Sequence, residues 1–258
     1  MNTFETQVSR LKAAAVFVAT LSIAGSSAMA GSGDPIVSFW AGNAQGAGAF
    51  NVDISDAQFN NGEIIVWNLI GGPVEIMDGG NTIATITSAQ LTLQAFSESL
   101  GQSLIALSFN VEAGAADTEF TISSSLIDSL NIPGALGRVT GTYSVSDGNL
   151  NGATLTGLAD GGGLYSAQYN GGNTFNELFT DGPYGVGVSE SDGGQQDIPD
   201  TGFTPVGADV NDMNSQWHFM LTAGDLAGGT SNYIIRVPAP AGAALFGMAG
   251  LFAARRRR

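Results

Sequence analysis

Short stretches in which apolar and polar residues alternate run through most of this chain, separated by turns rich in glycine, asparagine and aspartate. Residues 82–87 (TIATIT) and 89–96 (AQLTLQAF) show this period of two most clearly, and such a period is typical of a half-buried β-strand. The same pattern, with β-branched and aromatic residues between turn signals, predicts further strands at 36–40, 63–70, 103–111, 118–123, 138–146, 153–158, 164–169, 216–222 and 231–236.

Many short strands at a spacing of roughly ten residues predict an all-β fold, a β-sandwich or jelly-roll-like domain with long Gly- and Asp-rich loops. No repeat period typical of a β-solenoid is present. Residues 138–146 and 153–158 are expected to form a hairpin, and 124–130 (SSLIDSL) one or two helical turns. Residues 170–210 are dominated by Gly and Asp, which predicts either a long surface excursion or a strand-poor edge.

Charge is distributed very unevenly. Residues 31–236 contain two basic residues, Arg138 and Arg236, against 22 acidic ones, which gives this span a formal net charge of −20. Binding to nucleic acid through phosphate neutralisation is therefore excluded, because it needs clustered Lys and Arg. An anionic lipid surface is disfavoured for the same reason. Solubility in salty water and the binding of divalent cations remain as explanations for the acidity.

The chain contains no cysteine. Thiol catalysis, disulfide exchange and Cys-ligated metal centres are therefore excluded. A domain at 31–236 must be held together by its apolar core.

The N-terminal residues 1–30 have the layout of a signal peptide. Arg10 and Lys12 provide a basic flank, residues 13–25 are apolar, and Ala28 and Ala30 form an A-x-A cleavage site. The apolar stretch is short for a membrane span, which needs about 20 residues. We expect signal peptidase to cleave here and the rest of the chain to be exported across the inner membrane.

The C-terminal residues 237–258 have the layout of a second targeting signal. They contain a short motif, an apolar run at 241–254 and a basic end. The motif consists of Val237, Pro238, Ala239 and Pro240, and the basic end of Arg255, Arg256, Arg257 and Arg258. This layout resembles the PEP-CTERM sorting signal of Gram-negative bacteria, although Ala239 stands where that family usually has Glu. The resemblance covers this tail alone. It implies processing by an exosortase-like transpeptidase and contact with the membrane only through this segment; an ordinary C-terminal membrane anchor is the alternative.

The turn at residues 147–152 (DGNLNG) has oxygen-bearing side chains at alternate positions. Asp147, Asn149 and Asn151, followed by glycine, copy the first half of a calcium loop. The twelfth position of the loop is Leu158, where the calcium pattern requires Glu. A polar turn between strands needs no metal, so calcium is a candidate ligand here and no cofactor is required.

Catalytic residues are not evident in the sequence. His218 is the only histidine and lies in a predicted strand between Trp217 and Phe219, where we expect it to pack at an aromatic edge. A Gly-x-Ser-x-Gly elbow is missing. Paired carboxylates for glycoside hydrolysis remain open, because only their separation in space matters.

Aromatic side chains could provide stacking faces for sugars. The aromatic side chains considered are Trp40, Trp67, Trp217, Tyr165, Tyr169 and Tyr184. Trp67 and Trp217 lie in apolar runs and are expected in the core. Tyr165 and Tyr169 flank a Gly-rich turn and are expected to be exposed, which makes them the candidate ligand-stacking residues.

These observations predict three parts: a signal peptide at 1–30, an acidic all-β exported domain at 31–236 and a sorting or anchor segment at 237–258. The leading hypothesis is a non-enzymatic protein of the cell surface, cell envelope or extracellular matrix, processed or anchored through its PEP-CTERM-like tail. A carbohydrate-binding jelly-roll module with a polysaccharide partner is the first alternative. A secreted glycosidase-type hydrolase is the second.

Overall fold

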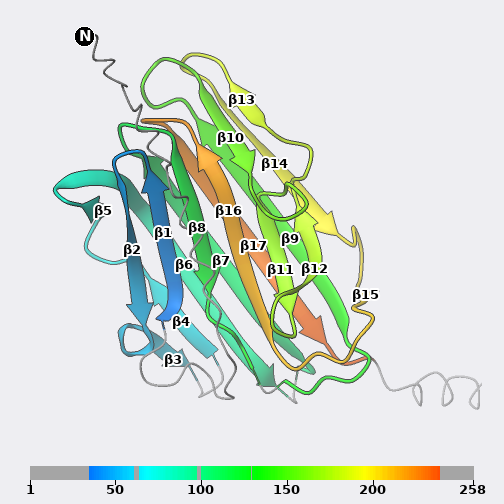
Figure 1. Ribbon diagram of the computed structural model, residues 1–258. Helices are drawn as coiled ribbons and strands as arrows, with labels where there is room; N and C mark the ends of the chain where they lie inside the picture. The colour runs from blue at the N-terminus through cyan, green and yellow to red at the C-terminus, as the bar shows by residue number, and fades with distance from the viewer. Residues whose placement is uncertain (1–34, 61–63, 98–99, 129, 239–258) are drawn as a thin grey trace, which may run out of the picture.

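The computed structural model describes residues 35–60, 64–97, 100–128 and 130–238, and these form a β-sandwich of two antiparallel sheets (Figure 1). The all-β prediction is therefore confirmed. The only helical element in the described ranges is a 3-10 turn at Ile54–Asp56.

The first sheet, sheet A, has eight strands. Six follow the order β12-β11-β16-β8-β1-β2, while β10 pairs with β16 and β13 with β10. Their bounds are β1 Pro35–Asn43, β2 Gly46–Asp53, β8 Thr118–Ser124, β10 Ala153–Gly157, β11 Tyr165–Tyr169, β12 Asn173–Leu178, β13 Tyr184–Val186 and β16 Met213–Leu221.

The second sheet, sheet B, has nine strands. Its main order is β14-β9-β17-β7-β6-β4-β3, with β15 paired to β9 and β5 paired to β6. Their bounds are β3 Gln58–Asn60, β4 Ile64–Asn68, β5 Val74–Asp78, β6 Asn81–Ser97, β7 Gln102–Ala113, β9 Leu136–Ser146, β14 Ser191–Ile198, β15 Thr204–Pro205 and β17 Leu226–Arg236.

The core lies between the two sheets, where each strand directs every second side chain inward. In β16, Trp217 and Phe219 are almost fully buried, while His218 between them faces outward. Aromatic rings join the layers: Phe109 of β7 meets Trp217 of β16 edge-on at 5.3 Å between centroids. The burial of apolar surface between the sheets stabilises the sandwich. Aromatic pairs with this edge-on geometry add further stabilisation.

The predicted strand segments 82–87 and 89–96 are confirmed, but they form one continuous strand, β6, in which the pairing register with β7 shifts between Ile86 and Ser88. A β-bulge of this kind moves the inward positions from even to odd numbers, so one strand looks like two. Residues 124–130 do not form helical turns where they are described; Ile127 instead bridges to Met213.

The expected hairpin at 138–158 is also wrong. Strand β9 pairs with β17 and β14 in sheet B, whereas β10 pairs with β16 and β13 in sheet A. Residues 147–152 therefore carry the chain from one sheet to the other. The loop-rich prediction for residues 170–210 is corrected as well, because β12, β13, β14 and β15 all lie there, and β14 forms an edge of sheet B.

Candidate functional site

The outer face of sheet A carries the most promising arrangement of side chains. In β1, Phe39 and Ala41 point into the core and are 1% and 0% exposed. Strand alternation therefore places Ser38, Trp40 and Gly42 on the outer face.

The half-buried indole of Trp40 reaches over Gly42 in the same strand. A Cβ atom at Gly42 would come within 2.6 Å of the ring's Cη2 and 2.7 Å of its Cζ2. The indole therefore occupies the space that a side chain at position 42 would need.

A polar row continues from Trp40 across the sheet. Thr121 of β8 pairs with Trp40 on one side and with His218 of β16 on the other. His218 Nε2 lies 2.8 Å from Glu119 Oε1, and these side chains are 27% and 37% exposed. His218 thus lies in a strand as expected, but its ring faces outward to a carboxylate instead of packing at an aromatic edge.

Hydroxyl and amide groups complete this surface. Gln216 Nε2 donates a hydrogen bond to Ser123 Oγ at 3.2 Å, and Ser38 Oγ donates one to Asn51 Oδ1 at 2.7 Å. We call this surface the Trp40 face; it comprises Ser38, Trp40, Asn51, Glu119, Thr121, Ser123, Gln216 and His218. It presents an aromatic ring among hydrogen-bond donors and acceptors, which suits a ligand with both C–H surfaces and hydroxyl groups.

The predicted stacking residues do not form this surface. Tyr165 is 0% exposed and Tyr169 is partly buried against the core, so the expectation that both are exposed is wrong. The two residues are four apart in one strand and therefore point to the same side, which faces the core. Trp67 and Trp217 lie in the core, as predicted.

The sequence alone could have identified part of the Trp40 face. The run Phe39-Trp40-Ala41-Gly42 alternates between inward and outward positions and places a large ring two residues from a glycine on one side. The pairing of Glu119 with His218 joins residues 99 positions apart. Only the neighbouring positions of β8 and β16 reveal it.

Hydrogen bonds to the carboxylate of Asp147 stabilise the turn at residues 147–152. Its Oδ1 accepts hydrogen bonds from the backbone N–H groups of Asn149, Leu150 and Asn151, and its Oδ2 accepts one from Ser189 at 2.7 Å. These bonds, led by the one from Ser189, lower the pKa of Asp147 below its usual range.

The backbone N–H groups of this turn already donate to the Asp147 carboxylate, whose oxygens a cation would need as ligands. The Nδ2 of Asn149 donates a hydrogen bond to the carbonyl oxygen of Ala223 at 2.6 Å. The carboxylate of Asp147 and the side-chain amide of Asn149 thus close a crossover between the two sheets. Within the described ranges, no three His, Asp or Glu side chains lie close enough together to hold a metal ion.

An apolar depression lies beside β1, β4 and β6. Its lining consists of Ile36, Ile54, Ile65, Leu93, Ala95, Ser125, Leu126 and Ile127. None of these residues carries a carboxylate, so this depression lacks the acid pair that glycoside hydrolysis requires.

Most of the predicted targeting residues lie outside the described residues. These are the cleavage-site residues Ala28 and Ala30, the second half of the tail motif at 239–240, and the arginines at 255–258. Val237 and Pro238 lie within the described residues. The backbone N–H of Val237 donates to the carbonyl of Gly101 at 3.0 Å, directly after β17 ends. In the part of the chain that is described, no helix is long and apolar enough to cross a membrane.

No protein-family model matches the chain, and no curated protein is significantly similar to it in sequence. Several solved structures are weakly similar in fold. One is the carbohydrate-binding module TmCBM61 in complex with β-1,4-galactotriose, with 12% identity and a TM-score of 0.29 over 57% of this chain and 88% of that one.

Two further structures are the adhesin domain of Epf from Streptococcus pyogenes and a protein of infectious bursal disease virus, Gx strain. The adhesin has 9% identity and a TM-score of 0.30, covering 77% of this chain and 57% of its own. The viral protein has 10% identity and a TM-score of 0.32, covering 82% of this chain and 54% of its own. Similarity at this level carries no argument about what the present chain binds.

Proposed function

We propose that this chain is an exported, non-enzymatic protein of the cell surface or extracellular matrix that binds polysaccharide through the Trp40 face. The observation that carries the proposal is the indole of Trp40, which rests on Gly42 with polar side chains on the neighbouring strands. A flat aromatic face can pack against the C–H side of a sugar ring. Thr121, His218 and Gln216 can bond to the sugar hydroxyls.

The geometry favours binding over hydrolysis. Glu119 and His218 lie on an open sheet face, where water has access to both partners. Glycoside hydrolysis requires two carboxyl groups held about 5 to 10 Å apart around the scissile bond, whereas the acid on this face is paired with an imidazole. The row of side chains instead crosses three neighbouring strands, β1, β8 and β16, on one face of the sheet, where a polymer chain could follow it.

Export and sorting are supported by the two ends of the sequence. The signal-peptide layout of residues 1–30 and the PEP-CTERM-like layout of residues 237–258 flank the acidic domain. We expect the mature chain to begin at Gly31 and to lose its arginine-rich end. Mass spectrometry of the protein recovered from its own cells tests this; a mature chain that retains Arg258 would contradict processing of the tail.

The binding proposal is tested with a glycan array and with polysaccharide isolated from the cells that make this protein. Trp40→Ala should abolish binding, and Trp40→Tyr should retain part of it, because tyrosine preserves an aromatic face. Phe59→Ala is the matched control, since Phe59 is an exposed aromatic residue on a different strand. Absence of binding to every polysaccharide, or equal binding by the wild type and Trp40→Ala, would overturn the proposal.

A further inference from the structure

The two arginines of the acidic domain lie side by side. Arg138 is in β9 and Arg236 ends β17. In the register of these neighbouring strands, Arg138 pairs with Ile234 and Arg236 pairs with Leu136, so the arginines are diagonal neighbours. Because Val139 and Ile235 are fully buried, both arginines face the outer side of sheet B. This side is opposite to the Trp40 face.

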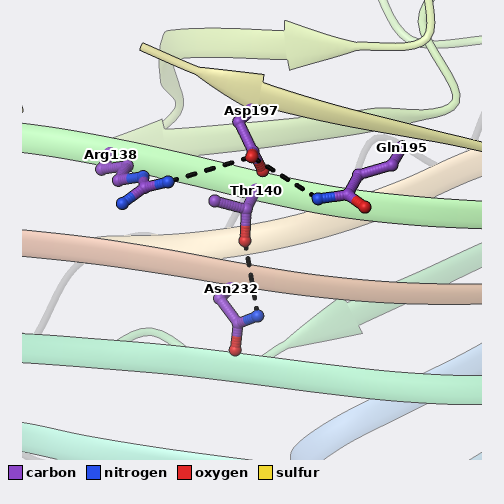
Figure 2. Close-up of polar contacts among 5 residues, drawn as sticks. All are labelled: Arg138, Thr140, Gln195, Asp197 and Asn232. Atoms are coloured by element: carbon purple, nitrogen blue, oxygen red, sulfur yellow. Dashed lines mark hydrogen bonds and ion pairs between the residues drawn. The ribbon is translucent and has the colours of Figure 1, made fainter. Parts of the chain in front are cut away.

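Neither guanidinium has a carboxylate within hydrogen-bonding distance among the described residues. Arg138 Nη2 forms an ion pair with Asp197 Oδ2 at 3.9 Å, a separation longer than a hydrogen bond (Figure 2). Arg236 lies over the ring of Phe203, 3.7 Å from its centroid, a cation–π contact that holds the side chain in place. The Nε atoms of both arginines are buried, with no hydrogen-bond partner among the residues that are described.

This arrangement is unusual for a span with a net charge of −20, in which acids are abundant. A guanidinium remains protonated at all ordinary pH values, so two neighbouring ones repel each other. The fold nevertheless brings the two together. The planar guanidinium group of arginine can donate two parallel hydrogen bonds to one carboxylate.

Hydroxyl and amide groups extend from the arginines across the sheet. Asn232 Nδ2 donates a hydrogen bond to Thr140 Oγ1 at 3.4 Å, and Gln195 Nε2 donates one to Asp197 Oδ2 at 3.5 Å; dashed lines in Figure 2 mark both contacts. Further along the same face, Ser108 and Thr230 share a hydrogen bond of 3.2 Å. The surface therefore has a small cationic end and a neutral polar continuation.

We propose that this surface, defined by Arg138, Thr140, Asp197, Phe203, Asn232 and Arg236, binds a carboxylated sugar unit of a glycan. Arg138 and Arg236 receive the carboxylate, and Thr140 and Asn232 bond to the hydroxyl groups of the sugar. Two guanidinium groups are enough to bind one carboxylate. The site is separate from the Trp40 face, so each can fail without the other.

Asp197 acts as an internal competitor in this arrangement. Its carboxylate lies beside Arg138 without a direct hydrogen bond. An incoming carboxylate would be repelled by Asp197 while being attracted by the arginine. Asp197→Asn keeps the shape of the side chain and removes this charge, so we expect it to strengthen binding.

The experiment measures binding of the full chain to polygalacturonate by calorimetry, in about 0.15 M salt, where charges more than roughly 8 Å apart are largely screened. The same polymer in methyl-esterified form is the neutral control. We expect esterification, or Arg138→Gln together with Arg236→Gln, to weaken binding by about tenfold or more, the scale of a lost charged hydrogen bond. Asp197→Asn should strengthen it several-fold, and Phe59→Ala, at an exposed residue of β3 outside both surfaces, should leave it unchanged.

Circular dichroism and melting temperature establish that the arginine variants are folded, and the gain in Asp197→Asn does not depend on any loss of structure. Free galacturonate should compete with the polymer, and acetate should not. The proposal is overturned if polygalacturonate fails to bind, if the esterified polymer binds equally well, or if Asp197→Asn has no effect. Competition by acetate equal to that by galacturonate would also overturn it, by showing a simple anion site.

Discussion

The indole ring of Trp40 covers Gly42 so closely that a Cβ atom at position 42 would lie 2.6 Å from Cη2 of the ring. This contact ties the orientation of an outward-facing aromatic side chain to the absence of a side chain two residues later. It also provides a way to move the ring without removing it.

Gly42→Ala should displace the Trp40 ring and weaken polysaccharide binding about as much as Trp40→Ala does. The strand should survive, because both residues lie on the outer face and alanine is tolerated in strands better than glycine, by roughly 0.5–1 kcal/mol. Binding and thermal unfolding are measured together. Gly185→Ala in β13 is the control, since a Cβ there meets no atom closer than 3.8 Å. Full binding by Gly42→Ala would show that the position of the ring is unimportant.

Ser231→Ala should destabilise the sandwich. Trp217 Nε1 donates to Ser231 Oγ at 3.1 Å, and both residues are 1% exposed. Removing the acceptor leaves a buried N–H group without a partner, which costs about 1–3 kcal/mol. Urea unfolding measures the change. Ser108→Ala, which removes an exposed hydroxyl bonded to Thr230, should change the free energy of unfolding by less than about 0.5 kcal/mol.

Tyr233→Phe should make the protein more resistant to alkali. Burial raises the pKa of the Tyr233 hydroxyl well above its usual range, and its oxygen has no hydrogen-bond partner among the described residues. The unfolded chain loses this proton above about pH 10 while the folded chain keeps it, so the stability of the wild type falls as pH rises.

Near pH 11 the phenylalanine variant should lose about 1.4 kcal/mol less than the wild type does, relative to neutral pH. Tyr165, whose pKa burial also raises, remains in the variant, so part of the alkaline loss should persist. Unfolding curves at pH 7 and pH 11 provide the comparison. Identical pH dependence in the two proteins would contradict the assignment.

Asp147→Asn should lower stability at neutral pH and flatten its dependence on acid. The pKa of Asp147 is lowered by the backbone N–H of Ser189 and by those of its own turn. The stabilisation is therefore present above the unfolded value, about 3.9, and is lost as the pH falls through the folded value. Melting temperatures between neutral and acid pH should converge for the wild type and the variant. Asp200→Asn, an exposed acid outside this turn, should leave the wild-type pH dependence intact.

Most strands could be predicted because neighbouring side chains of a strand point to opposite faces of the sheet, so apolar and polar residues alternate along the sequence. The long strand β6 is an exception, since the extra residue at its bulge changes the phase of that alternation. The hairpin expected around Asp147 fails for another reason. Local turn chemistry indicates that the chain turns there, but it does not specify that β9 and β10 belong to different sheets.

The candidate sites, too, could be predicted from the sequence only in part. Glycines precede Tyr165 and follow Tyr169, which predicts exposure, yet both side chains point inward. The sequence by itself determined the all-β class, the burial of Trp67 and Trp217, the acidic character of the domain and the lack of thiol chemistry. Only the tertiary structure decided that Trp40 covers Gly42, that Glu119 meets His218 and that Arg138 lies beside Arg236. Alternation fixes which residues of a strand share a side, whereas strand pairing over long sequence separations fixes which sides meet and which residues become neighbours.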